Sequence, residues 1–226
     1  MEGKIIMANY MIIGGHGKVA LLAAPLLVAE GHCVTSVIRN PEHIADVEAT
    51  GASALVLDIE SATVDELTSV FTGQNAIVWS AGAGGGNPSR TYAVDRDAAI
   101  RSMDAAQQAG VQRYVMVSYY GASTDHGVPK DNSFFHYAEA KGAADAYLRG
   151  TDLNWTILGP TTLTLDEPTG KISLGGTFGR DAERGTVSRG NVAHTIVAAL
   201  KNDRTIGKSL PYSDGDDDID EVFARL

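Results

Sequence analysis

Three small residues, Gly14, Gly17 and Ala20, stand three positions apart directly after a short apolar run. Gly14 permits a tight turn, Gly17 lets a phosphate approach the backbone, and Ala20 lets a following helix pack closely on the strand. The free N–H groups and the dipole at that helix N-terminus both favour an anion. The spacing therefore predicts a site for a dinucleotide pyrophosphate, with a plain glycine-rich turn as the alternative. The other positions assigned to this site are His16, Lys18 and Val19.

A cation follows the second predicted strand, residues 33–38. Arg39 stands where a dehydrogenase that prefers NAD usually carries an acid for the ribose 2′-OH. A guanidinium suits a 2′-phosphate, which it can bind through paired hydrogen bonds. Arg39 therefore predicts NADP in preference to NAD. The alternatives are NAD as cofactor and a surface role for this arginine.

The ends of the next two predicted strands supply further candidates for cofactor binding. Asp58 can accept a hydrogen bond from an adenine amino group, and Ile59 can pack on the ring. Capping of the following helix is an equal alternative for Asp58. Small residues after the fourth predicted strand allow a ribose and a pyrophosphate to lie on the backbone. These residues are Ser80, Ala81 and Gly82.

A hydroxyl, a phenol and an ammonium group form the third set of candidates. Ser118 ends the fifth predicted strand, and Tyr137 and Lys141 lie four residues apart in the next predicted helix. That spacing places the two helical residues on one face. The alternative is an amphipathic helix with an aromatic residue on its inner face and a solvated lysine.

The elements that position these residues alternate along the chain. Continuous or alternating apolar runs predict strands, and 3.6-residue periodicity predicts helices. Strands are expected over residues 10–13, 33–38, 54–57, 76–80, 114–118, 155–158 and 208–212. Helices are expected over residues 18–30, 64–71, 92–109, 137–148 and 192–200. This alternation predicts an α/β fold, a Rossmann-type doubly wound parallel sheet with helices on both faces.

The length and the pattern after Pro160 suggest one domain. The chain has 226 residues, of which 44% are hydrophobic, which suffices for one substantial core. Residues 1–226 are therefore interpreted as one nucleotide-binding domain. Within it, residues 161–226 are expected to form a small C-terminal segment that covers the substrate, and residues 161–185 an insertion over the carboxyl edge of the sheet.

Charge and hydropathy limit the partners. The net charge of −10 disfavours nucleic acid, and no apolar run is long enough to span a membrane. We see no signal peptide, and residues 1–8 are either a start-site extension or a lead-in to the first strand. A cytoplasmic location is expected. An unidentified small-molecule substrate is the expected partner, and a homodimer is left open.

The only cysteine and an acidic run have ordinary interpretations. Cys33 is expected to be a small buried residue in a strand, and it cannot form an intrachain disulfide. The run from Asp214 to Glu221 lacks the ligand spacing of an EF-hand, so no metal is expected there. A solvated acidic stretch is the prediction.

The chain resembles the atypical, NAD(P)-binding branch of the short-chain dehydrogenase/reductase superfamily, which includes NmrA-like and epimerase/dehydratase-like reductases. The resemblance covers residues 10–160. The residues that carry it are Gly14, Gly17, Ala20, Arg39, Asp58, Ser80, Ala81, Gly82, Ser118, Tyr137 and Lys141.

The resemblance implies a role for each member of the third set. Tyr137 would be the general acid for carbonyl reduction or the base for alcohol oxidation. Lys141 would lower the pKa of Tyr137 and reach the nicotinamide ribose, and Ser118 would hydrogen-bond the substrate oxygen. Pro160 would shape the nicotinamide pocket. The stretch Leu158-Gly159-Pro160 departs from the branch, which often has an arginine before the proline.

Three functions are consistent with these features. The first is an NADP(H)-dependent oxidoreductase that reduces a small carbonyl compound or oxidises an alcohol. The second is a non-enzymatic redox sensor that binds the dinucleotide and reports through a partner protein, which the missing arginine favours. The third is a sugar-nucleotide epimerase or dehydratase, which the short stretch after Pro160 makes less favoured.

Overall fold

The first strand, β1 (Asn9–Ile13), lies within a nine-stranded sheet and contributes side chains to both of its faces. The computed structural model describes residues 7–175 and 185–226. Tyr10 and Ile12 pack into one hydrophobic core, and Met11 and Ile13 pack into the other. The period of two in a strand explains this division, and it is why a continuous apolar run is needed in a sheet that is covered on both sides.

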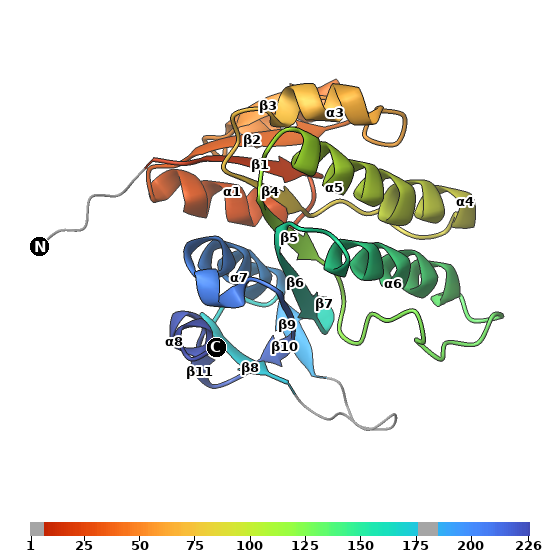
Figure 1. The fold of residues 1–226 in the computed structure, drawn as a ribbon. Coiled ribbons are helices and arrows are strands. Elements are labelled where there is room, and N and C mark those ends of the chain that lie inside the picture. Colours follow the sequence, from red (N-terminus) through yellow and green to blue (C-terminus); the bar gives the residue numbers. More distant parts are fainter. Residues whose placement is uncertain (1–6, 176–184) are drawn as a thin grey trace, which may run out of the picture.

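The central part of the sheet is parallel and doubly wound (Figure 1). The strand order is β11-β8-β10-β6-β5-β4-β1-β2-β3. The chain runs outward from β1 to β3, then crosses to the other side of β1 for β4 and continues outward again. The switch in strand order therefore falls between β1 and β4, where a ligand site is expected at the carboxyl ends of the strands. The remaining strands are β2 (Cys33–Ile38), β3 (Ser53–Val56), β4 (Ala76–Trp79), β5 (Arg113–Val117), β6 (Asn154–Pro160), β7 (Thr162–Thr164), β8 (Lys171–Leu174), β9 (Thr186–Ser188), β10 (Lys208–Asp214) and β11 (Asp217–Asp218).

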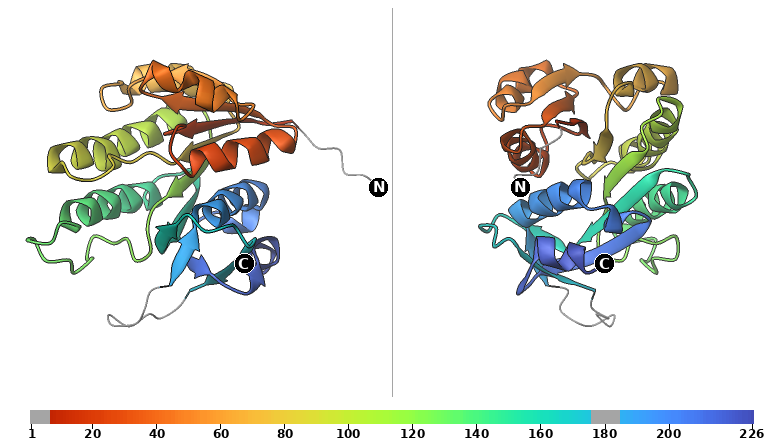
Figure 2. Two further views of the ribbon diagram at one scale, coloured as in Figure 1. Left: turned by 180° about the vertical axis from the view of Figure 1, so that it is seen from behind. Right: turned by 60° about the vertical axis from the view of Figure 1, so that its left-hand side comes forward.

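Helices cover both faces of the sheet (Figure 2). One face carries α1, α7 and α8, and the other carries α3, α5 and α6. The bounds of the α-helices are α1 (Ala20–Ala29), α2 (Ile44–Glu48), α3 (Val64–Phe71), α4 (Pro88–Thr91), α5 (Ala99–Gln108), α6 (Phe135–Arg149), α7 (Arg189–Lys201) and α8 (Ile219–Ala224). The shorter helical segments are η1 (Pro41–His43), η2 (Tyr92–Ala98) and η3 (Asp203–Thr205). The predicted Rossmann-type fold is confirmed.

The C-terminal segment does more than the predicted cover. β10 extends the parallel sheet beside β6, and β8 then pairs antiparallel with both β10 and β11. α7 packs against α1 in the core, while β7 and β9 form a separate two-stranded sheet. Part of the insertion predicted over residues 161–185 lies outside the described residues, as does most of the N-terminal stretch 1–8.

The helix predicted over residues 92–109 is divided. α4 precedes it, η2 is a π-helix, and only then does the regular α5 begin. The Oδ2 atom of Asp95, in the middle of η2, accepts a 3.0 Å hydrogen bond from the amide of Ala83. A π-helical turn inside a helix often marks a functional position. Here it lies where the chain passes the carboxyl end of β4.

Two predictions about single segments need correction. Cys33 is exposed, because it is the first residue of β2, and its Sγ lies 3.8 Å from Met7 Sδ at that end of the strand. The acidic run is not merely a solvated stretch, since Asp218 caps α8 and Asp214 accepts a 2.6 Å hydrogen bond from Asn191. No three acidic, histidine or cysteine side chains within residues 7–175 and 185–226 are grouped to hold a metal.

Hydropathy adds one observation. None of the helices in the described ranges is both long enough and apolar enough to cross a bilayer.

Candidate functional site

The glycine turn after β1 packs directly against the end of β4. Gly14 has a φ of +84°, and a Cβ on it would lie 2.6 Å from the Cα of Ala81. Both the backbone conformation and the close approach therefore require glycine at this position. A Cβ on Gly17 would lie 3.0 Å from the carbonyl oxygen of Gly14. The predicted turn thus joins the two strands that flank the switch point.

The backbone of this turn leaves N–H groups for an anion. The amides of Gly15 and Gly17 are used within the protein, each in a 2.8 Å bond. In the described part of the chain, no hydrogen bond engages the amides of His16, Lys18 or Val19. These amides precede α1, whose dipole also favours negative charge. The predicted pyrophosphate site is therefore chemically suited to its ligand.

A pocket of about 280 Å³ lies on one side of the turn. We call it the Arg39 pocket. It contains most of the residues predicted to bind the cofactor. Its lining residues are Gly14, Gly15, His16, Gly17, Val37, Ile38, Arg39, Asn40, His43, Leu57, Asp58, Ile59, Glu60, Ser80, Ala81, Gly82, Arg90 and Val94.

A second pocket, of about 300 Å³, lies on the other side of the turn. We call it the Tyr137 pocket. Its lining residues are Gly17, Lys18, Val19, Ser80, Ala81, Gly82, Asp95, Val117, Ser118, Tyr137, Leu163 and Arg189. The two pockets share the walls formed by Gly17 and residues 80–82. An extended ligand that crosses the glycine turn would therefore reach both. Lys141 and Pro160 line neither pocket.

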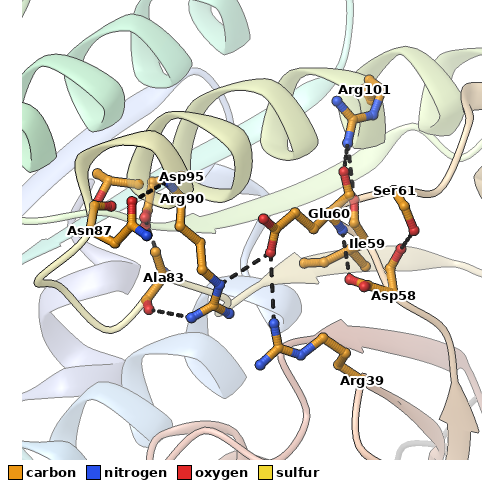
Figure 3. Close-up of polar contacts among 11 residues, drawn as sticks. Arg39, Asp58, Ile59, Glu60, Ser61, Ala83, Asn87, Arg90, Asp95 and Arg101 are labelled. Atoms are coloured by element: carbon orange, nitrogen blue, oxygen red, sulfur yellow. Dashed lines mark hydrogen bonds and ion pairs between the residues drawn. The ribbon is translucent and has the colours of Figure 1, made fainter.

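Arg39 is not a free cation. Its Nη1 lies 3.7 Å from the Oε2 atom of Glu60, and Arg90 Nε lies 3.1 Å from the same oxygen (Figure 3). Arg39 stands at the position where a dehydrogenase that prefers NAD usually carries an acid. The structure places a different acid, Glu60, beside it. A phosphate at Arg39 has to compete with this carboxylate.

Asp58 lies in the turn that follows β3. Its Oδ1 atom accepts a 3.0 Å hydrogen bond from the amide of Glu60. The cap of α3 is Thr63, which forms a reciprocal capping box with Glu66. The alternative in which Asp58 caps that helix is therefore wrong. The adenine contact stays a prediction, and Asp58 and Ile59 both face the Arg39 pocket.

Ser118 and Tyr137 meet at the Tyr137 pocket, as their positions predict. The hydroxyl of Ser118 donates a 2.6 Å hydrogen bond to Asp145 Oδ2. Tyr137 lies beside the rings of Tyr119 and Phe134, with ring centroids 5.6 and 5.2 Å away. The pocket therefore contains a hydroxyl and a phenol, and the phenol ring packs against two aromatic rings that are not among the lining residues.

The lysine of the predicted pair is directed into the protein. Lys141 is 1% exposed, and its Nζ donates a 2.9 Å hydrogen bond to the carbonyl oxygen of Val117. Burial lowers the pKa of Lys141, and the carboxyls of Asp145 and Asp95 oppose that shift. The lysine is therefore neither solvated nor part of either pocket wall. Its contact with a ribose stays a prediction.

The expected effect of Lys141 on Tyr137 is wrong. Burial raises the pKa of the Tyr137 hydroxyl above its ordinary value, and the carboxyls of Asp95 and Asp145 raise it further. Lys141 is not among the groups that shift this pKa. Tyr137 thus holds its proton at neutral pH, a state that suits proton donation better than proton abstraction.

Asp95 adds a carboxyl to the Tyr137 pocket. It is 1% exposed, and its Oδ1 atom has no hydrogen-bond partner among the described residues. That oxygen lies 3.1 Å from where a Cβ on Gly82 would stand. Burial raises the pKa of Asp95, while Lys141 and the amide of Ala83 lower it. An unpaired buried carboxyl oxygen is costly and needs an explanation in function or structure.

Pro160 is held by the sheet. It is the last residue of β6, it is buried, and its carbonyl oxygen accepts a 2.8 Å hydrogen bond from the amide of Tyr120. It lines neither of the two pockets. Its role beside the nicotinamide stays a prediction.

Sequence reasoning missed several charged residues of the site, including Arg189, which lines the Tyr137 pocket. Asp145 had a signal, since it stands four residues after Lys141 and eight after Tyr137, on the same helical face. Asp95 could be found only through the π-helical turn. Glu60 and Arg90 are separated by 30 residues, and nothing local in the sequence links them.

The chain is similar to known proteins over nearly its whole length. A family described as NAD(P)H-binding matches residues 14–203, a range that includes every residue lining the two pockets. A Bacillus subtilis protein, named uncharacterized sugar epimerase YhfK, is 31% identical over 217 residues. The match covers 95% of this chain and 98% of that protein.

Two solved structures share the fold. One is named "Putative NAD-dependent epimerase/dehydratase" from Bacillus halodurans. It is 28% identical, with a TM-score of 0.87, over 97% of this chain and 100% of that one. The other is the oxidoreductase ylbE from Lactococcus lactis. It is 26% identical, with a TM-score of 0.84, over 96% of each chain.

Proposed function

The chain belongs to the NAD(P)H-binding family within the atypical short-chain dehydrogenase/reductase superfamily, and from that membership we propose that it is an NADP(H)-dependent reductase of a small carbonyl compound. In the reverse direction it would oxidise the corresponding alcohol. The relatives' names include both oxidoreductases and epimerases, so the choice between these activities depends on the site.

The continuity of the two pockets is the observation that carries this proposal. Gly17 and residues 80–82 belong to both walls, so a dinucleotide that enters beside Arg39 would end beside Ser118 and Tyr137. The bound nicotinamide supplies or accepts a hydride. The chain's own residues then hold the ligand, position the carbonyl oxygen and provide its proton.

Tyr137 is the proposed proton donor. Its raised pKa keeps the phenol protonated at neutral pH, and it faces a pocket that also contains Ser118. The Ser118 hydroxyl is the proposed partner of the substrate oxygen. Both groups lie at the carboxyl end of the sheet, the usual place for reacting groups in an open α/β sheet.

NADP(H) is the proposed cofactor, and the C-terminal segment is the proposed substrate side. Arg39 is 55% exposed at the wall of its pocket, where a guanidinium can receive a 2′-phosphate. Leu163 and Arg189 line the Tyr137 pocket from the segment after Pro160. We propose that this segment supplies substrate contacts within one nucleotide-binding domain.

A substrate screen tests the proposal. The protein is mixed with NADPH and with small aldehydes, ketones and quinones, and NADPH absorbance is followed; uridine diphosphate sugars are added as a separate arm for epimerase or dehydratase activity. Turnover of at least one carbonyl compound is expected. Failure of every carbonyl compound, with conversion of a sugar nucleotide, would contradict the reductase proposal.

A second candidate is a dinucleotide sensor without turnover. The position of Lys141 favours it, because this amine is bonded to Val117 and lies outside both pocket walls. A sensor would bind NADPH and turn over nothing in the screen. NADPH and NADP⁺ would then be compared for their effect on the protein's proteolytic cleavage pattern, since a sensor has to respond differently to the two redox states.

A further inference from the structure

Two arginines converge on one carboxylate in the wall of the Arg39 pocket. Glu60 Oε2 lies 3.1 Å from Arg90 Nε and 3.7 Å from Arg39 Nη1 (Figure 3). The three residues come from the end of β2, the turn after β3 and helix α4. All three line the pocket, and their side chains are 55%, 31% and 35% exposed for Arg39, Glu60 and Arg90. The group is therefore within reach of a ligand.

The backbone that carries Glu60 is held independently of both arginines. Arg101, from α5, donates hydrogen bonds of 3.1 and 2.9 Å to the carbonyl oxygens of Ile59 and Glu60 (Figure 3). It also donates a 3.1 Å hydrogen bond to the carbonyl oxygen of Ala62. Asp58 accepts the amide hydrogen of Glu60 on the other side. A change at the Glu60 carboxylate is therefore expected to alter charge in the pocket without moving the turn.

Arg90 is fixed as well. Its Nη1 donates a 2.9 Å hydrogen bond to the carbonyl oxygen of Ala83, and its amide is capped by Asn87 Oδ1. The guanidinium is thus attached to the small-residue loop that forms the wall common to both pockets. Its Nε donates a 3.1 Å hydrogen bond to Glu60 Oε2.

Resting on the proposed function, we propose that Glu60 sets this chain's choice between phosphorylated and unphosphorylated dinucleotides. In this proposal Arg90 is a second arm, with Arg39, of the site for a ribose 2′-phosphate. A phosphate that binds between the two arginines would lie beside the Glu60 carboxylate, which already pairs with both of them. Repulsion between the two anions therefore weakens NADPH binding. A ribose 2′-OH can instead donate to the carboxylate, so the same residue favours NADH.

Because Glu60 is proposed to weaken NADPH binding and to strengthen NADH binding, measurements of binding alone can test the proposal. Dissociation constants for NADPH and NADH are measured by calorimetry on the wild type and Glu60→Gln at one fixed ionic strength. We expect NADPH to bind about fivefold more tightly to the variant, the scale of one partly exposed ion pair. We expect NADH to bind equally or more weakly. Glu42→Gln is the matched control, since Glu42 is an exposed glutamate three residues after Arg39 in the sequence and does not line the pocket.

Arg90 is tested in the Glu60→Gln background. Arg90→Gln should weaken NADPH and 2′,5′-ADP together, while NADH and 5′-AMP change little; Arg90→Lys should restore part of the loss. Equal losses for all four ligands would mean that Arg90 acts through the loop at Ala83, which overturns its assignment to the phosphate site.

The other outcomes separate the two proposals. If NADPH and NADH both bind the wild type but their ratio is the same in Glu60→Gln, or changes as much in Glu42→Gln, the Glu60 proposal is wrong and the proposed function stands. If neither dinucleotide binds the wild type, both proposals are overturned.

Discussion

Ser118 Oγ donates its only hydrogen to Asp145 Oδ2, over 2.6 Å, at a place where both side chains are buried. While that hydrogen is engaged, Ser118 can accept a hydrogen bond from a ligand but cannot donate one. When the Asp145 carboxyl is protonated, it can donate its own hydrogen to Ser118 Oγ. The Ser118 hydroxyl can then donate its hydrogen to a substrate oxygen. Burial raises the pKa of Asp145, which favours that protonated state. The proposed role of Ser118 therefore depends on a residue outside the pocket wall.

Asp145→Asn is expected to stabilise the protein at neutral pH. Asp145, Asp95 and Lys141 together would carry one net negative charge in the core if all were ionised. Because the folded-state pKa of Asp145 is raised, its stability contribution is full below the unfolded pKa and is lost as pH rises through the folded pKa. Asparagine avoids that loss.

The measurement is thermal unfolding as a function of pH. The gain in Tm should be absent at acid pH and should appear as pH rises through the raised pKa, by about 2–4 °C for each kcal/mol. Asp152→Asn, at an exposed aspartate, is the control. A gain that is the same at every pH would show that charge is not its cause.

Lys141→Met is expected to destabilise strongly. The substitution removes the hydrogen bond to Val117 and the buried cation whose charge favours the ionised forms of Asp95 and Asp145, and leaving buried carboxyls uncompensated costs about 3–5 kcal/mol. Denaturant unfolding at neutral pH measures the loss. Lowering the pH, or adding Asp145→Asn, should recover part of it, since each removes a charge that the lysine balanced. A loss that neither treatment reduces would mean that Lys141 acts by packing alone.

Arg39→Asp is expected to reverse the cofactor preference toward NADH. The substitution removes a guanidinium from the pocket and puts a second acid beside Glu60, so a 2′-phosphate meets two negative charges. Titration with NADPH and NADH tests it, with Arg204→Asp, at an exposed arginine, as the control for net charge. Equal affinities in the wild type, or an unchanged preference in the variant, would contradict the assignment of Arg39.

Gly17→Val is expected to abolish binding of both dinucleotides without unfolding the protein. The added side chain would project from the wall shared by the two pockets, close to the carbonyl oxygens of Gly14 and Ser80. Gly150→Val, at the end of α6 and away from both pockets, is the matched control. Dinucleotide titration with circular dichroism gives the answer. Retained binding with a normal spectrum would remove the glycine turn from the site.

Most of the fold could be predicted because its elements are encoded locally. The strand at residues 33–38 has the bounds of β2, and the strand at 10–13 differs from β1 by one residue. The division of residues 92–109 was not predictable in this way, since the π-helical turn is accompanied by a contact between Asp95 and Ala83 across 12 residues. The antiparallel edge formed by β8 and β11 likewise depends on contacts distant in sequence.

The same distinction between local and long-range features applies to the site. The glycine turn is a local motif, and helical spacing correctly places Tyr137 and Lys141 on one face. Their depths are different: Tyr137 reaches the pocket, whereas Lys141, one turn later, is held against β5. The pKa of Tyr137 differs from the prediction because it depends first on burial and then on Asp95 and Asp145, neither of which the sequence shows to be close.

Tyr137→Phe separates an enzyme from a sensor. Phenylalanine keeps the ring beside Tyr119 and Phe134 and removes only the transferable proton. NADPH affinity should change little, while turnover of any carbonyl substrate found in the screen should fall by about 100-fold or more, the usual scale of lost general acid catalysis. Tyr147→Phe is the control on the same helix, since that hydroxyl is bonded to Asp104 on the outer surface.

The pH dependence makes this test specific to proton donation. Because the pKa of Tyr137 is raised by burial and by two carboxyls, the wild-type phenol stays protonated across the neutral range. Activity should fall as pH rises through the raised pKa of Asp145, because its deprotonation withdraws the Ser118 hydrogen, and Asp145→Asn should flatten that part of the profile. If Tyr137→Phe keeps the activity, Tyr137 is a packing residue and its assignment as the proton donor is wrong.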